Sequence, residues 1–234
     1  GEVSRHVAQV LDHGVLTIRS GGERFERPFL VMEYLDGETL AATLARRGRL
    51  PLAEVVPIVR QLGRALAATH AAGVVHRDLK PGNVFLVRDE EGRPFVKLID
   101  FGVAKTSARE LTETGALIGT PAYMSPEQIR GDKEIDGRAD LWALTAIAYC
   151  LLVGEPPFGE GTVAEITARV LWKDVEPPSA RVPGLSPALD AWVRRGLARE
   201  ASARFPTADE LVRALEAAAS GSPFLPEMAE AAAR

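Results

Sequence analysis

The spacing of apolar residues changes along the chain from a strand-like pattern to a helical one. Near the N-terminus, Val15–Arg19 and Pro28–Leu35 are separated by the turn residues Ser20-Gly21-Gly22 and five further residues, and this arrangement predicts a hairpin with a long connection. Residues 29–32 of the second segment are continuously apolar. Such a run predicts a strand that is buried on both faces.

From Thr39 onward the pattern is mostly helical. In Pro51–Ala72, apolar residues recur at steps of three and four, with a proline in the first turn and Gly73 just past the end. Asp140–Val153 is apolar nearly all round, which predicts a buried helix. Shorter amphipathic helices are predicted at Thr39–Arg47, Thr162–Trp172, Pro187–Arg199 and Thr207–Ala219.

A second hairpin interrupts the helical part, because Val84–Val87 and Phe95–Ile99 flank a turn at residues 89–92. It places Asn83 and Asp100 at strand ends, where a rigid backbone can aim both side chains at one ion. Residues 103–124 are predicted to form a long loop, and a loop of this length in a compact domain is usually functional or disordered.

Composition limits the classes of function. The chain has 234 residues, of which 46% are hydrophobic and 26% charged, as in an ordinary globular protein. A net charge of −4 gives no reason to expect a nucleic-acid or anionic-membrane partner. A single cysteine, Cys150, excludes an internal disulfide and fits a cytoplasmic location. The longest apolar run, Ala143–Val153, is too short to span a bilayer, although a membrane-anchored parent protein stays open, as does the oligomeric state.

The candidate chemistry lies in residues 76–83, HRDLKPGN, and residues 100–102, DFG. Asp78 can accept a proton from a hydroxyl, and Asn83 and Asp100 offer oxygens to Mg²⁺, a hard cation that is usually held together with substrate phosphates. The pattern H-R-D-L-x-x-x-N followed by D-F-G is the signature pair of protein kinases. The chain therefore resembles a bacterial Ser/Thr protein kinase of the eukaryotic type.

The resemblance implies an α+β, protein-kinase-like fold. Residues 1–36 would be the last two strands and the hinge of the small N-terminal lobe. Residues 37–220 would be the mostly helical C-terminal lobe, and residues 221–234 a tail that we expect to fray.

The same resemblance implies transfer of the ATP γ-phosphate to Ser and Thr hydroxyls of protein substrates. Asp78 would orient the hydroxyl and take its proton, and Lys80 would offset charge at the γ-phosphate. Asn83 and Asp100 would hold Mg²⁺, with Mn²⁺ as an alternative. Thr120 would contact Asp78 and Lys80 beneath the substrate peptide.

Regulation is implied by Arg77, which in such kinases commonly pairs with a phosphate on the loop after D-F-G. Thr112 and Thr114 are the acceptors that we expect to be autophosphorylated. The alternative is that both are ordinary loop threonines.

Segment Gly119–Glu127 resembles the end of the kinase activation loop, with S-P-E where the family often has A-P-E. By resemblance, Glu127 forms a buried ion pair with Arg204, and Asp140 ties down the backbone of the catalytic loop. Structural roles are thus implied for five residues: His76, Phe101, Glu127, Asp140 and Arg204.

On the adenine side, the resemblance assigns Met32 to the back of the pocket and Phe85 to the face beneath the ring. Glu33 and Leu35 match the connector whose backbone groups bond adenine. Without the motifs, each of these four residues is equally well explained as plain core.

Two kinase features do not occur in the 234 residues: there is no G-x-G-x-x-G, and the first lysine is Lys80. The chain also begins with Gly1, so we expect an N-terminally truncated part of an active kinase that is inactive alone. A catalytically silent pseudokinase that works by binding is the alternative. A small-molecule phosphotransferase would share the metal geometry but is not expected to have the peptide-docking segment Gly119–Glu127.

Overall fold

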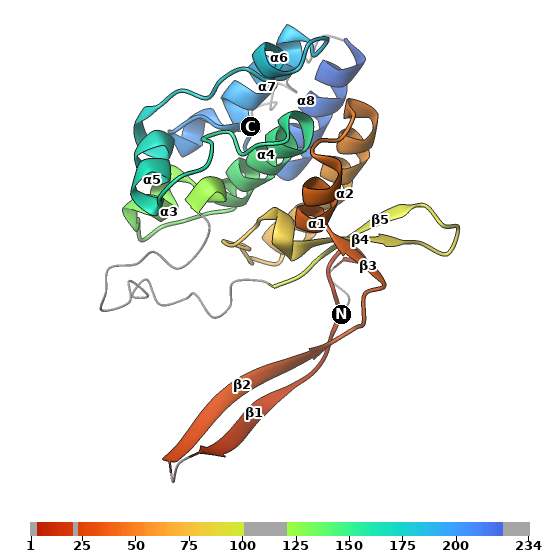
Figure 1. Cartoon of the computed structure of the whole chain (residues 1–234), viewed down its shortest axis with the longest axis vertical. Coiled ribbons are helices and arrows are strands. Elements are labelled where there is room, and N and C mark those ends of the chain that lie inside the picture. Colours follow the sequence, from red (N-terminus) through yellow and green to blue (C-terminus); the bar gives the residue numbers. More distant parts are fainter. Residues whose placement is uncertain (1–3, 21–22, 101–120, 222–234) are drawn as a thin grey trace, which may run out of the picture.

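The computed structural model describes residues 4–20, 23–100 and 121–221 (Figure 1). It consists of a helical body, a small sheet at one end of that body, and a two-stranded hairpin that projects from it (Figure 1). This arrangement confirms the predicted α+β class. The elements are β1 (Val10–Ser20), β2 (Glu23–Met32), β3 (Gly37–Thr39), α1 (Leu40–Arg47), α2 (Leu52–Ala71), β4 (Val84–Arg88), β5 (Pro94–Leu98), α3 (Pro126–Arg130), α4 (Arg138–Val153), α5 (Val163–Trp172), α6 (Pro178–Arg181), α7 (Pro187–Gly196) and α8 (Ala208–Ser220).

Helix α4 forms the centre of the body. All of its residues from 139 to 152 are buried, as the apolar pattern predicted. It contacts α2, α6 and α7, while α8 packs against both α2 and α7. Apolar area removed from water in this way is the main favourable term in folding, so α4 is the element that the body is built around.

The three-stranded sheet has the order β3-β4-β5 and is antiparallel. Residues before β1 join it, since the Leu98 amide donates to the His6 carbonyl (2.7 Å) and the Ala8 amide donates to the Leu98 carbonyl (2.9 Å). β5 contacts α2, which fixes the sheet to the body. The β4–β5 hairpin was predicted, whereas β3 was too short to be recognised.

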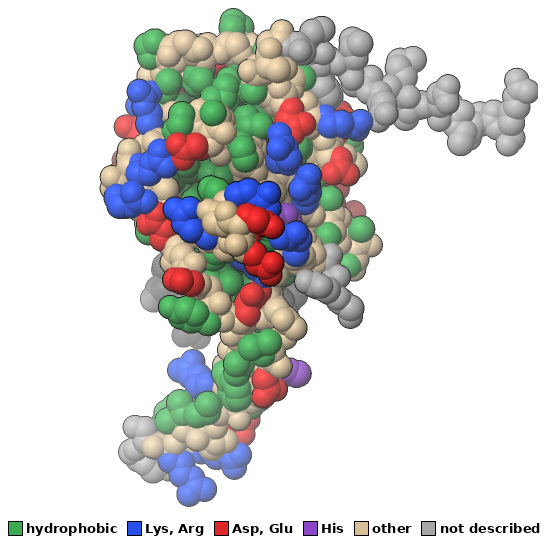
Figure 2. Space-filling view, turned by 90° about the vertical axis from the view of Figure 1, so that its right-hand side faces the viewer, with side chains coloured by type: hydrophobic (Ala, Val, Ile, Leu, Met, Phe, Trp, Pro, Cys, Tyr) green, Lys and Arg blue, Asp and Glu red, His purple; other side chains and the backbone are tan. Residues whose placement is uncertain are grey.

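β1 and β2 form a separate antiparallel sheet, paired from Val10↔Met32 to Ser20↔Glu23. The prediction that residues 29–32 are buried on both faces is wrong here, because Leu30 is 60% and Val31 42% exposed. The physical reason is that a two-stranded sheet has no second layer to cover it. Figure 2 shows hydrophobic side chains gathered along this hairpin.

The shorter helices begin and end near the predicted residues. Thr39 caps α1 by accepting a hydrogen bond from the Ala42 amide (3.1 Å), and Gly48 ends it at a positive φ of 73°. α7 ends at Gly196, three residues before the predicted Arg199, and the short α6 was not predicted. In the described residues, no helix is both long and apolar enough to cross a membrane.

Candidate catalytic site

The segment between α2 and β4 contains the H-R-D-L-x-x-x-N motif and is strained at one residue. Among the described residues other than glycine, φ is positive at Arg77 (63°) and Asp100 (54°). A left-handed backbone costs a residue with a side chain about 1–2 kcal/mol. Strain of this kind persists only where surrounding contacts enforce it, and it often marks a functional site.

Asp140, at the start of α4, supplies those contacts. Its carboxylate is 1% exposed and accepts hydrogen bonds from the backbone amides of His76 (2.8 Å) and Arg77 (2.9 Å). His70 of α2 also bonds to it through Nε2 (2.8 Å). Asp140 therefore ties the catalytic segment to the most deeply buried helix.

His76 connects this segment to the end of β5. The side chain is fully buried, its Nε2 lies 3.0 Å from the Ile99 carbonyl, and its Nδ1 accepts from the Asp78 amide (3.2 Å). Burial lowers the pKa of His76, partly opposed by Asp140. A neutral ring that accepts at Nδ1 carries its proton on Nε2, which donates to Ile99.

Asp78, Lys80 and Asn83 form one cluster. Lys80 Nζ lies 2.9 Å from Asp78 Oδ2, and Asn83 Nδ2 donates to the Asp78 carbonyl (2.9 Å) and to Oδ2 (3.2 Å). The Asp78 side chain is held from two sides but keeps 15% of its surface exposed. A carboxylate that is both oriented and accessible can take a proton from a bound hydroxyl.

A backbone hydrogen bond brings Asp100 close to this cluster, because the amide of the preceding residue, Ile99, donates to the Asn83 carbonyl (3.0 Å). Its side chain is exposed. Since the Asn83 amide nitrogen bonds to Asp78, the Asn83 amide oxygen and the Asp100 carboxylate are the oxygens that suit a hard cation. Within residues 4–20, 23–100 and 121–221, no group of three or more His, Cys, Asp or Glu could hold a metal alone. The donor set therefore fits an Mg²⁺ ion shared with phosphate oxygens.

The adenine-side residues lie along the junction of hairpin and body. Met32 ends β2 and Phe85 lies on β4, both half-buried. The Glu33 carboxylate pairs with Lys97 (2.6 Å), and the Glu33 amide donates to the Gln9 carbonyl (3.0 Å).

A cavity of about 600 Å³ lies beside Glu33 and Leu35, and Lys97 and Phe95 also line it. Met32 and Phe85 are not among its lining residues, and neither are Asp78 and Asn83.

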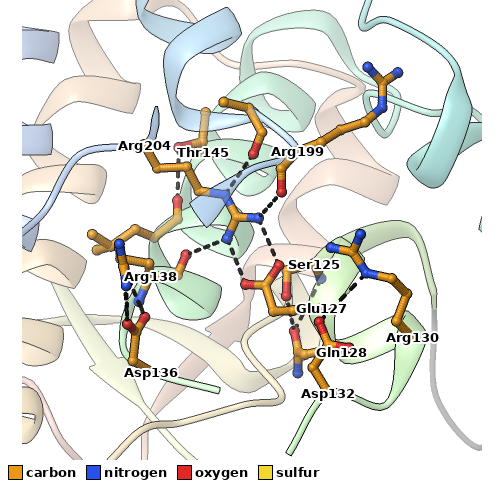
Figure 3. A network of polar contacts seen from close by, with 12 residues as sticks. Ser125, Glu127, Gln128, Arg130, Asp132, Asp136, Arg138, Thr145, Arg199 and Arg204 are labelled. Atoms are coloured by element: carbon orange, nitrogen blue, oxygen red, sulfur yellow. Dashed lines mark hydrogen bonds and ion pairs between the residues drawn. The ribbon is translucent and has the colours of Figure 1, made fainter. Parts of the chain in front are cut away.

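Glu127 and Arg204 form a bidentate ion pair, with two N–O distances of 2.7 Å (Figure 3). Arg204 also donates to the carbonyls of Arg138, Ala198 and Arg199 and lies over the ring of Trp142. Burial alone would raise the pKa of Glu127, but the hydrogen bonds and charge of Arg204 outweigh it and lower that pKa. The pair fixes α3 to the body.

Sequence reasoning missed Gln128, whose side-chain amide donates to the carbonyl of Arg77 (2.7 Å). The signal that could have found it is the Ser125-x-x-Gln128 pattern, which is a capping box. That pattern predicts a local bond to Ser125 but not the contact across 51 residues. Four expected site residues, Phe101, Thr112, Thr114 and Thr120, lie outside the described residues.

A comparison with known families identifies the chain. The model of the protein kinase domain matches residues 6–214. The chain belongs to the protein kinase family. This confirms the resemblance drawn from the H-R-D and D-F-G motifs.

Similar bacterial proteins are named as serine/threonine-protein kinases. Pkn1 of Myxococcus xanthus is 45% identical over 197 residues, 82% of this chain and 28% of Pkn1. PknB of Mycobacterium leprae is 38% identical over 84% of this chain and 31% of its own length. PknL of Mycobacterium tuberculosis is 37% identical over 92% of this chain and 53% of its own length. This kinase chain thus spans between about a quarter and about half of these relatives.

Among solved structures, the crystal structure of the PknI kinase domain of Mycobacterium tuberculosis matches with a TM-score of 0.68 and 29% identity. The match covers 92% of this chain and 73% of that one. The fold of the kinase chain is therefore supported by both sequence and structure.

Proposed function

We propose that the chain carries the catalytic residues of a Ser/Thr protein kinase, which transfers the γ-phosphate of ATP to hydroxyls of proteins. The observation that carries the proposal is the cluster of Asp78, Lys80 and Asn83, held next to Asp100 by buried anchors. The Ser/Thr preference rests on Lys80 and on the printed names of Pkn1, PknB and PknL. Lys occupies this position in Ser/Thr kinases, as the resemblance implies.

In this proposal, Asp78 accepts the proton of the substrate hydroxyl as the oxygen attacks the γ-phosphate. Lys80, 2.9 Å from Asp78, is near enough to offset charge that develops on the transferred group. Asn83 keeps the Asp78 carboxylate from rotating, since its amide bonds both the backbone and the side chain of Asp78. Positioning together with electrostatic stabilisation supplies most of the catalysis in phosphoryl transfer.

Asn83 and Asp100 are proposed to hold Mg²⁺. A bound ion would supply positive charge that offsets the negative charge of the ATP phosphates. Met32, Glu33, Leu35 and Phe85 are proposed to surround adenine.

Because no lysine precedes Lys80 in the 234 residues, these residues alone lack the usual cation for the α- and β-phosphates. We therefore expect weak ATP binding from the 234-residue polypeptide by itself. A comparison of its ATP affinity with that of the full-length protein measures this deficit. Equal affinities would contradict the expectation.

We also propose regulation by phosphates on Thr112 and Thr114, paired with the Arg77 guanidinium. Peptide mass mapping of the active, full-length protein tests it. If both threonines are unmodified, this part of the proposal is wrong.

The decisive experiment is the nearly isosteric change Asp78→Asn in the full-length protein. Phosphate transfer to peptides that carry only Ser, only Thr or only Tyr is measured with ATP and Mg²⁺. We expect wild-type transfer to Ser and Thr peptides, and a loss of at least about 100-fold in the variant, the scale of general-base catalysis. ATP affinity, measured by calorimetry, should be unchanged.

The alternative function is a binding module without catalysis, which predicts that neither the wild-type protein nor the Asp78→Asn variant transfers phosphate. Transfer to a small molecule but to no peptide would instead indicate a small-molecule phosphotransferase. Both outcomes contradict the proposal.

A further inference from the structure

Gln128 of α3 uses both ends of its side-chain amide. Its oxygen accepts from the backbone N–H of Ser125 (3.1 Å) and from the Ser125 hydroxyl (3.2 Å). Its nitrogen donates to the carbonyl of Arg77 (2.7 Å). Figure 3 shows Gln128 beside Ser125 and one residue from the Glu127–Arg204 ion pair. The amide therefore connects the start of α3 to the catalytic segment.

The peptide that Gln128 reaches is the one that joins Arg77 to Asp78. Its carbonyl oxygen accepts from Gln128, and its N–H, which belongs to Asp78, donates to His76 Nδ1 (3.2 Å). The preceding N–H, that of Arg77, donates to Asp140 (2.9 Å). With Arg77 in the left-handed region, this peptide plane is held away from its relaxed orientation by bonds on both sides.

We propose that Gln128 is a positioning residue for phosphoryl transfer, which fixes the Arg77–Asp78 peptide and thereby aims the Asp78 carboxylate at the substrate hydroxyl. This inference rests on the proposed kinase activity. Lys80 and Asn83 hold the side chain of Asp78, whereas Gln128 holds the backbone from which that side chain projects. A shift of about 1 Å in a reacting group can lower the rate about 100-fold. Fixing the backbone of Asp78 should therefore raise the rate of phosphate transfer.

The support of Gln128 is rigid enough for this role. The neighbouring Glu127 is fixed by Arg204, which is fully buried and bonded to three backbone carbonyls. A side chain that stands on a fixed element positions its partner more accurately than one on a loop.

A purely structural role, as a cap of α3, is the competing explanation. The substitution Gln128→Glu separates the two, because a glutamate can still accept from Ser125 as in an ordinary S-x-x-E capping box. An ionised carboxylate has no proton to donate to the Arg77 carbonyl. Capping alone therefore predicts normal activity, and positioning predicts slower transfer.

The experiment measures kcat, KM for ATP and KM for a Ser/Thr peptide in the full-length protein, together with thermal unfolding. For Gln128→Glu and Gln128→Ala we expect kcat to fall about tenfold, the effect of one lost hydrogen bond to a partly buried carbonyl. KM for ATP should change less than about twofold, because the hydrogen bond acts on Asp78 and not on the nucleotide.

Gln61→Glu is the matched control. Gln61 of α2 also bridges two backbone groups, since it accepts from the Val96 amide (2.9 Å) and donates to the Pro94 carbonyl (3.3 Å). The same chemical change there should leave kcat within about twofold of wild type. An equal loss of kcat in Gln61→Glu would overturn the proposal.

Hydrogen exchange gives a readout that does not need activity. In Gln128→Glu, the amides of residues 76–80 should exchange faster than in wild type, with the amides of α4 unchanged. Normal kcat and normal exchange, or a lower unfolding temperature with normal kcat, would refute the positioning role. Absence of transfer by wild type as well would instead refute the kinase proposal, and exchange would still decide whether Gln128 holds the peptide.

Discussion

Helix α4 and the β1–β2 hairpin are both rich in apolar residues but have opposite environments. Residues 139–152 of α4 are all buried, whereas Val15 and Leu30 of the hairpin are 61% and 60% exposed. Helices α2 and α7 pack against α4, while the hairpin consists of one layer of two strands. Burial therefore depends on which elements surround a segment more than on its own hydrophobicity.

The same contrast explains how the proposed catalytic and adenine-side residues are supported. Asp140 projects from the buried start of α4 and holds the catalytic segment by two backbone amides. The adenine-side residue Met32 stands instead at the end of the exposed hairpin. The proposed base, Asp78, is thus supported by contacts within the body, whereas the proposed adenine side includes a residue of the exposed hairpin.

The largest expected effect comes from breaking the buried ion pair of the body. Arg204→Ala leaves the Glu127 carboxylate without its bidentate partner and should lower the free energy of unfolding by about 3–5 kcal/mol. Urea denaturation measures it. The control is Arg130→Ala, which removes an exposed pair with Asp132 and should cost less than about 1 kcal/mol. An equal decrease in the free energy of unfolding in both variants would show that burial does not determine how much an ion pair contributes to stability.

Next in size is the loss of one apolar side chain from each region. Leu144→Ala removes a fully buried side chain of α4 and should cost about 2–5 kcal/mol. Leu16→Ala, at a side chain of the hairpin that is 52% exposed, should change stability by less than about 0.5 kcal/mol. The two free energies come from the same urea experiment. A cost for Leu16→Ala near that of Leu144→Ala would mean that the hairpin is buried in solution.

A smaller effect is expected from pH. Burial lowers the pKa of both His6 and His76, so the folded chain keeps them neutral when the unfolded chain already takes up protons. Their contribution to stability is complete above the ordinary histidine pKa of about 6.5 and is lost as the pH falls below it. Urea unfolding at about pH 7.5 and about pH 5.5 should reveal a lower stability at the acidic value.

His6→Gln removes one of the two titrating groups and should reduce that difference. A stability that is the same at both pH values would contradict the prediction. Glu127 does not affect this comparison of stability between about pH 7.5 and about pH 5.5. Because its pKa is lowered, its contribution to stability is lost only as the pH falls below the ordinary glutamate pKa of about 4.3.

The smallest change in stability is expected from Leu30→Gln on the hairpin, within about 0.5 kcal/mol of wild type. The same variant should reduce self-association of the 234-residue chain, because open strand edges with apolar side chains pair readily with other chains. Light scattering as a function of concentration measures this. Unchanged self-association would show that the hairpin is not the surface through which copies of the chain associate.

Much of the local structure followed from the sequence. The predicted helix at Pro51–Ala72 is observed as α2 at Leu52–Ala71, and Asp140–Val153 lies within α4. Long helices with a clear period and strong end signals are the easiest elements to recognise. Strand β3 and helix α6 were missed because three or four residues carry no measurable period.

In the candidate site, the residues of one local motif were predictable from the sequence, whereas one of the long-range contacts was not. Asp78, Lys80 and Asn83 lie within six residues of one another, so a local motif indicates that they are close together. The resemblance suggested Asp140 and the Glu127–Arg204 pair as long-range anchors, and the structure contains these contacts. Gln128 was not suggested, because its contact with Arg77 depends on how α3 packs.

The sequence by itself determined the order of the longer helices and strands and the residues that can accept a proton or bind a cation. These features depend on side-chain chemistry and on spacing within a few residues. Only the tertiary structure decided three features. Arg77 adopts a left-handed backbone, the Gln128 side chain donates a hydrogen bond to the Arg77 carbonyl, and the apolar β1–β2 hairpin is exposed. Each of these depends on packing between segments far apart in the chain, which a local pattern does not encode.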